Sequence, residues 1–233
     1  MKTILRPSGE QYFLKDAVRD LIVVIVGILA ALYLESWWQD RQDRAEEALL
    51  LEGLRAEFVA NKEQLVEKMS AWSYANKSAN RARQFMGMSA DELEATEVTR
   101  AFKGAGYYPF FDPRTGQLSS LISSGKLGLI QKAKLRAMIA DWPSLVEDLG
   151  VEREIALEMV TTGYYFRLRE YLSDDENSPF KNRIAELLSD KMIYGDLGGA
   201  RSNTDRSLRE GETILQATDE IIAMIDAELE NSQ

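Results

Sequence analysis

The longest apolar stretch of the chain lies near its N-terminus. Fourteen uncharged residues run from Leu21 to Leu34, with the sequence LIVVIVGILAALYL, and two tryptophans follow at positions 37 and 38. A membrane-spanning helix needs about 20 apolar residues to cross roughly 30 Å of hydrocarbon. The segment 17–38 has 22 residues and keeps its charged side chains near its two ends, where they can reach lipid headgroups. We therefore predict a transmembrane anchor at 17–38, after an N-terminal cytoplasmic segment at 1–16.

Aromatic residues at one end of this segment support the anchor, because tyrosine and tryptophan favour the membrane interface. Two alternatives remain open. A buried core helix usually carries a polar stripe, which is absent here. A cleaved signal peptide needs small residues at its cleavage site, whereas bulky residues follow Ala30–Ala31. The residues that we assign to the anchor are Leu21, Ile25, Gly27, Ala31, Tyr33, Trp37 and Trp38.

A seven-residue repeat of mostly apolar positions follows the anchor. From Gln39 to about Met86 the chain has no proline and one glycine, and good helix formers dominate. One position of the repeat holds Leu51, Phe58, Leu65, Trp72, Ala79 and Met86, and the partner position holds Leu54, Asn61, Lys68, Ala75 and Ala82. This spacing packs helices side by side, as in a coiled coil. We expect one helix of an intramolecular bundle, with a dimeric stalk as the alternative.

Turn and capping residues divide the rest of the chain into shorter helices. We expect helices from Ser89 to about Gly104, at 117–124, from about Lys132 with a kink or new start at Pro143, at 144–172, at 178–194, and from Asn203 to Glu230. The signals are a Ser89/Glu92 capping box, Gly125 as a C-terminal cap, Ser178–Pro179 as a helix start, and glycines 195, 198 and 199 as a break. Since no segment alternates as a strand does, the chain is predicted to be all-α, with a transmembrane helix continuing into a helical bundle domain at 39–233.

Two segments outside the regular pattern are candidates for contacts. Residues 107–116 combine two prolines with four aromatic residues, Tyr107, Tyr108, Phe110 and Phe111. These form either an exposed surface for a partner or a plug folded against the end of the bundle, which we favour because large exposed apolar patches are uncommon. Serines at 119, 120, 123 and 124 interleave with apolar residues. We expect them to allow close helix packing, with a hydroxyl-lined pocket as the alternative.

Composition narrows the chemistry. Residues 1–38 carry four basic and four acidic side chains, so the whole net charge of −10 belongs to residues 39–233. An acidic domain argues against nucleic-acid binding, which needs clustered lysine and arginine. The chain has no histidine and no cysteine, which removes the commonest general base, thiol chemistry and the usual zinc ligands. We therefore assign no catalytic, metal or cofactor residue, and interpret Asp174–Asn177 as a solvated acidic turn rather than a calcium loop.

Two stretches resemble a known family. Residues 13–58 read FLKDAVRDLIVVIVGILAALYLESWWQDRQDRAEEALLLEGLRAEF, and residues 117–130 read QLSSLISSGKLGLI, with Leu135–Arg136 shortly after. Both resemble a family of uncharacterised bacterial membrane proteins in which an apolar segment, a tryptophan and a charged helix are followed later by a serine-glycine segment. The resemblance implies a single-pass membrane protein with a helical domain. It carries over no catalytic residue.

Charge around the anchor suggests an orientation. The nearest basic residues are Lys2, Arg6, Lys15 and Arg19 before the apolar run 21–34, and Arg41, Arg44 and Arg55 after it. The positive-inside rule then favours a cytoplasmic N-terminus and a periplasmic bundle domain in the bacterial inner membrane.

We expect a non-enzymatic, sensor-like or scaffold module that contacts membrane lipid and binds a protein partner or a small ligand. One alternative is a structural subunit of a membrane assembly that self-associates through its transmembrane helix, since Gly27 and Ala31 form a small-xxx-small pair. The other is an enzyme that relies on Asp and Glu alone.

Overall fold

The computed structural model describes residues 9–161, 163–173 and 182–231, and every regular element in these ranges is helical. The elements are α1 (Gly9–Phe85), η1 (Ala90–Glu92), α2 (Ala95–Ala105), α3 (Gly116–Ser123), η2 (Lys126–Leu129), α4 (Ala133–Thr161), α5 (Tyr164–Leu168), α6 (Ile184–Leu187) and α7 (Lys191–Asn231). The predicted all-α class is confirmed, because one long apolar N-terminal helix leads into a helical bundle. The chain divides into two compact units, residues 1–49 and 50–233.

In the N-terminal unit, the apolar run of α1 is exposed. The large side chains between Leu21 and Leu34 range from 46% exposed at Ile25 to 72% at Tyr33. Among the described residues, α1 is the one helix long and apolar enough to cross a membrane, by length and composition. The structure therefore contains the candidate spanning helix that the sequence predicts.

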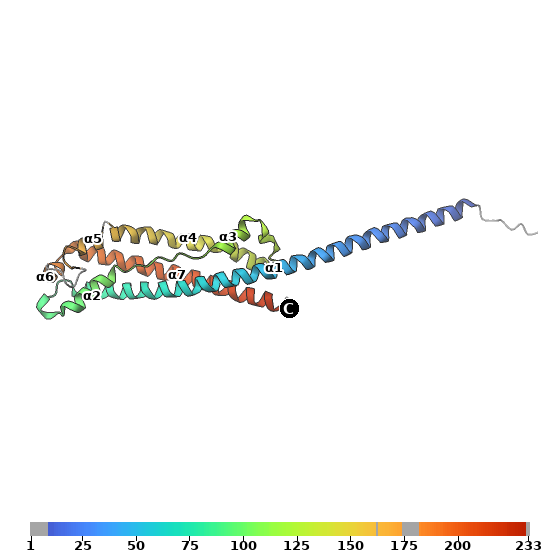
Figure 1. Cartoon of the computed structure of the whole chain (residues 1–233). Helices are drawn as coiled ribbons and strands as arrows, with labels where there is room; N and C mark the ends of the chain where they lie inside the picture. Colours follow the sequence, from blue (N-terminus) through green and yellow to red (C-terminus); the bar gives the residue numbers. More distant parts are fainter. Residues whose placement is uncertain (1–8, 162, 174–181, 232–233) are drawn as a thin grey trace, which may run out of the picture. The chain divides into compact units, whose positions relative to one another are not determined.

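In the bundle unit, α1, α4 and α7 lie side by side, and the shorter elements stand near the two ends (Figure 1). The predicted seam of α1 is confirmed, since Leu51, Phe58, Leu65 and Trp72 are at most 1% exposed. It faces other helices of the same chain, as expected for an intramolecular bundle. The Phe58 ring meets the Trp142 ring of α4 edge-on, with centroids 5.3 Å apart.

A second apolar cluster fills the end of the bundle unit where α2, α5 and α6 lie. It joins the last buried residues of α1 to α2, α5, α6 and the start of α7. The Tyr164 hydroxyl of α5 donates a hydrogen bond of 2.6 Å to the carbonyl of Phe102 in α2, so even the polar atom of this buried ring has a partner. The members of this second apolar cluster include Ala79, Ala82, Phe85, Val98, Phe102, Tyr164, Leu168, Leu187, Ile193 and Leu197.

The predicted break at the glycines near position 198 is wrong, because α7 runs through them without interruption. Each glycine lowers the intrinsic helix preference by about 1 kcal/mol, but packing offsets this. A Cβ atom at Gly198 would lie 2.9 Å from Nη1 of Arg83, which donates a hydrogen bond to the carbonyl of Tyr194. The absence of a side chain at Gly198 thus leaves room for the Arg83 guanidinium group beside α7.

The true start of α7 is marked by Asp190. Its Oδ1 accepts hydrogen bonds from the backbone N–H groups of Met192 at 2.7 Å and Ile193 at 3.3 Å. An aspartate in this position satisfies N–H groups that have no partner within the helix. The expected helix at 178–194 is therefore wrong where the structure describes it, since only α6 and the start of α7 are helical there. The Ser178–Pro179 signal and the acidic turn at 174–177 lie outside the described residues.

The expected helix at 144–172 is two helices. α4 passes through Pro143 without a new start and ends at Thr161, and α5 begins at Tyr164. Between them, a Cβ atom at Gly163 would lie 3.1 Å from the Met159 carbonyl oxygen, so glycine allows the chain to turn close to the end of α4.

The predicted capping box is also wrong. Ser89 makes no side-chain cap, Glu92 lies in the 3₁₀ turn η1, and α2 begins only at Ala95. In α7, the sequence repeats Leu208, Leu215, Ile222 and Leu229 every seven residues, with Thr218 and Ile225 between them, which suggests a bundle seam, but the structure centres the buried face on other positions and on Thr218 and Ile225. Leu208, Leu215, Ile222 and Leu229 are only partly buried, whereas the fully buried face holds Ser207, Gly211, Ile214, Thr218, Ile221 and Ile225.

Candidate functional site

The aromatic segment after α2 packs mainly inward. Phe111 is buried, Tyr108 and Phe110 are partly buried, and Tyr107 is 52% exposed. The Tyr108 ring stacks on Trp72 with centroids 5.7 Å apart, and Trp72 Nε1 donates a hydrogen bond of 2.9 Å to the Pro109 carbonyl. The segment runs from α2 to α3 along the bundle (Figure 1), and the Tyr108–Trp72 contact packs it against the side of α1 rather than across the end of the bundle. A partner surface here stays a prediction, with Tyr107 as its exposed member.

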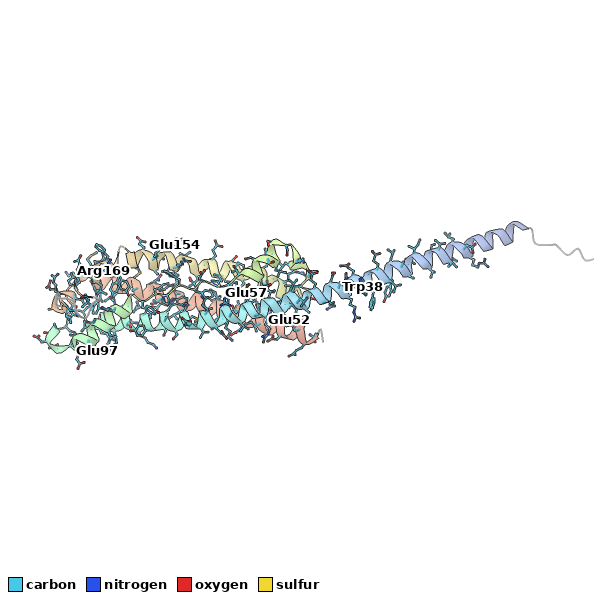
Figure 2. All side chains as sticks on the ribbon, viewed as in Figure 1. Trp38, Glu52, Glu57, Glu97, Glu154 and Arg169 are labelled. Atoms are coloured by element: carbon cyan, nitrogen blue, oxygen red, sulfur yellow. The ribbon has the colours of Figure 1, made fainter. Side chains whose placement is uncertain are left out.

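Two polar residues of α1 hold the far end of this segment. The buried Asn61 side chain donates to the Arg114 carbonyl at 2.7 Å and accepts from the Arg114 N–H at 2.8 Å. The Glu57 carboxylate (labelled in Figure 2) accepts the N–H groups of Gln117 at 2.8 Å and Leu118 at 3.0 Å. A carboxylate at a helix N-terminus is favoured by the helix dipole. Asn61, which interrupts the apolar repeat of α1, therefore holds residues 107–116 against that helix through hydrogen bonds to the Arg114 backbone.

The serine face of α3 does not pack closely. Ser119, Ser120, Ser123 and Ser124 are all exposed, so the expected role in close helix packing is wrong. Apolar contacts of α3 are made instead by Leu118 and Leu121, on its other side. The predicted cap is confirmed at the next residue, because Gly125 has the left-handed backbone conformation, with φ of 70°.

The residues assigned to the anchor lie on the exposed surface of α1. Leu21, Ile25, Gly27, Ala31 and Tyr33 are all exposed. Trp37 and Trp38 are 50% and 58% exposed, and Arg41 lies 5.7 Å from the centre of the Trp37 ring.

A cleft of about 440 Å³ lies between α4 and α7, two helices that pack against each other. Its volume falls within the usual range of small-molecule pockets, roughly 300–1,000 Å³. The lining residues are Leu145, Asp148, Val151 and Glu152 of α4 and Arg206, Glu210, Thr213 and Ile214 of α7. Their spacing places them on one face of each helix.

Buried carboxylates distinguish this cleft. Glu152 is only 2% exposed, and it forms an ion pair with Arg206, with 2.9 Å between Oε1 of Glu152 and Nη1 of Arg206. Its Oε2 and Oε2 of Glu210 are both buried and have no hydrogen-bond partner among the described residues. Most buried polar atoms in proteins are hydrogen-bonded, so two orphaned acceptors in one cleft require an explanation.

Burial and the charges of the cleft shift the pKa values of Glu210 and of the nearby Tyr108. Burial, together with the negative charges of Glu152 and Asp148, raises the pKa of Glu210. Burial also raises the pKa of Tyr108 to about 12, and the charges of Glu152 and Glu210 act in the same direction. Tyr108 thus stays a neutral hydroxyl at physiological pH and shares a hydrogen bond with Ser207. Within the described residues, no group of three or more Asp, Glu, His or Cys side chains could hold a metal ion.

No residue of this cleft is among the candidate site residues predicted from the sequence. One signal was present, because Glu152 stands at helical spacing between Leu149 and Ala156, both of which are buried. An acidic residue on an otherwise apolar helix face indicates either an ion pair or a site. The facing residues of α7 gave no comparable signal, since Arg206 and Glu210 belong to a helix rich in charged residues.

Comparisons of the chain with protein-family models, curated proteins and solved structures find no match. The resemblance to a family of bacterial membrane proteins therefore stays a prediction.

Proposed function

We propose that this is a single-pass protein of the bacterial inner membrane whose helical bundle is a non-enzymatic, sensor-like or scaffold module that binds a protein partner or a small ligand. The exposed apolar run of α1 carries the proposal. Burying a Leu, Ile or Val side chain is worth about 1.5–3 kcal/mol, and α1 leaves such residues exposed all round from Leu21 to Leu34. Hydrocarbon is the environment in which that surface is stable.

The non-enzymatic part of the proposal rests on composition and on the cleft. Without histidine, the chain lacks the commonest general base and the usual activating partner of a serine nucleophile, and without cysteine it lacks a thiol nucleophile. The cleft between α4 and α7 is of a size for a small ligand and offers charge and apolar surface. Turnover of generic hydrolase substrates by the pure protein, abolished by changing one carboxylate, would contradict the proposal.

Orientation in the membrane can be tested with Ser123→Cys, because the chain has no cysteine of its own and Ser123 is exposed. If the bundle is periplasmic, a membrane-impermeant maleimide labels this variant in intact cells whose outer membrane admits the reagent. The matched control is Ser8→Cys in the N-terminal segment, for which we expect labelling only after lysis. The reverse pattern would place the bundle in the cytoplasm.

A structural subunit that self-associates through α1 is the alternative, and one observation favours it. A Cβ atom at Gly27 would meet no heavy atom within 4 Å, so this small-residue face is open to a second helix.

For this alternative, Gly27→Ile is expected to disrupt a detergent-stable oligomer, measured by size-exclusion chromatography with light scattering. Since the isolated chain accommodates the larger side chain, a loss of mass reports contact between copies. Leu29→Ile, two positions along the same helix, should leave the mass unchanged. A wild-type monomer, or an oligomer that survives Gly27→Ile, contradicts this alternative.

A further inference from the structure

The unpaired oxygens in the α4–α7 cleft call for hydrogen-bond donors. Arg206 satisfies only one oxygen of Glu152, and Oε2 of Glu152 and of Glu210 accept nothing from the described residues. Leaving a buried acceptor without a partner destabilises the fold, and more so when the acceptor is charged. Because both orphaned atoms are acceptors, the missing group is a donor.

The charge of the cleft points to a cation. Asp148, Glu152 and Glu210 contribute three carboxylates, against two guanidinium groups, those of Arg206, whose side chain is 46% exposed, and of the nearby Arg209. Burial raises the pKa of Glu210 and the charge of Glu152 raises it further, and a bound cation reduces that repulsion. The attraction between opposite charges is considerably stronger in a partly desolvated cleft than on an open surface.

The remaining lining residues favour an organic cation over a metal ion. Leu145, Val151 and Ile214 supply apolar surface, and Thr213 supplies a hydroxyl group. An ammonium group carries three N–H donors and can meet several oxygens at once. Metal-ligand sets of three or more acidic side chains are absent among the described residues.

We infer that the cleft between α4 and α7 binds a small aliphatic amine, with its ammonium group between the carboxylates of Glu152 and Glu210 and its hydrocarbon chain against Leu145, Val151 and Ile214. The inference rests on the proposed binding function, for which it names the ligand class. It does not depend on the membrane anchor or on its orientation.

The test is calorimetric titration of the full-length protein in detergent micelles with cadaverine, 1,5-pentanediol and magnesium chloride. We expect saturable binding of cadaverine only, because the diol lacks the charge and magnesium lacks the apolar chain. Glu210→Gln is expected to weaken cadaverine binding by about 10-fold, since it removes a charge-assisted hydrogen bond. Glu152→Gln should act similarly, and circular dichroism checks that each variant is folded.

Glu212→Gln is the matched control, because it makes the same change at an exposed position of α7 that does not line the cleft. Its affinity for cadaverine should equal that of the wild type. Equal affinity for the diol, a preference for magnesium, no cadaverine binding by the folded wild type, or an unchanged affinity in a folded Glu210→Gln variant would each overturn the inference. Membrane location is measured separately by cell fractionation, so failure here is distinguishable from failure of the proposed anchor.

The affinity should also depend on pH. The charged or titratable groups around the site are Asp148 and Glu152 of α4, Arg206, Arg209 and Glu210 of α7, and Tyr108. Because the pKa of Glu210 is raised, this carboxyl takes up a proton before an ordinary glutamate does as the pH falls, and the amine loses a partner. Cadaverine binding should therefore weaken toward acid pH in the wild type and change less in Glu210→Gln.

Discussion

The double variant Ile25→Arg/Leu29→Arg is expected to move the protein from the membrane fraction to the soluble fraction. Both residues lie within the exposed apolar run of α1. An arginine near the centre of a spanning helix costs about 2.5–3.5 kcal/mol on insertion scales, so two outweigh much of the gain from the remaining apolar residues. The measurement is alkaline carbonate extraction of cell membranes, with the protein detected in pellet and supernatant.

A control that adds the same two positive charges is Leu49→Arg/Val66→Arg. These two residues are exposed and apolar but lie outside the apolar run, so this protein should stay in the pellet. Wild-type protein in the carbonate supernatant would contradict membrane anchoring. Equal release of the two double variants would show that added charge alone accounts for the effect.

Trp72→Ala is expected to lower the free energy of unfolding by about 3–5 kcal/mol, the usual cost of removing a fully buried tryptophan. The Trp72 side chain is completely buried, stacks on Tyr108 and donates a hydrogen bond to the Pro109 carbonyl. Its loss leaves a cavity and an unpaired carbonyl where the aromatic segment joins α1. The change is measured by urea unfolding of the full-length protein in detergent micelles, followed by circular dichroism.

Two companion variants separate the contributions. Trp72→Phe keeps an aromatic ring but removes the hydrogen-bond donor. It should lower the free energy of unfolding by about 1–2 kcal/mol. Tyr107→Ala removes an exposed ring of the same segment and should stay within about 0.5 kcal/mol of wild type. A Trp72→Ala variant as stable as Tyr107→Ala would mean that the aromatic segment is not packed on α1.

The hydrophobic pattern of the sequence predicted α1 well, because all the residues of this segment favour the same structure, a helix. Leu51, Leu54, Phe58, Leu65 and Trp72 repeat at helical spacing without proline, and each of them is buried. The apolar run before them needed no tertiary information either. Fourteen uncharged residues specify a helix with an apolar surface on every side.

Signals that depend on a single residue were less dependable. Ser89 and Glu92 fit a capping box, yet neither side chain caps a helix there. Glycines 195, 198 and 199 suggested a break, yet α7 is helical through all three and packs against α1 there through Arg83. A cap or a glycine shifts the local balance by only about 1 kcal/mol, which packing elsewhere in the chain exceeds.

The amino-acid order therefore sets the helical class, the exposed apolar run and the seam of α1, because these depend on periodicity along one continuous segment. Tertiary structure decides the cleft, since Glu152 and Glu210 are distant in sequence and meet only because α4 packs against α7. It also decides that Glu57 caps α3 and that Asn61 fastens the aromatic segment. A carboxylate or amide on a helix surface acquires its role from the segment that folds against it, and no local pattern carries that information.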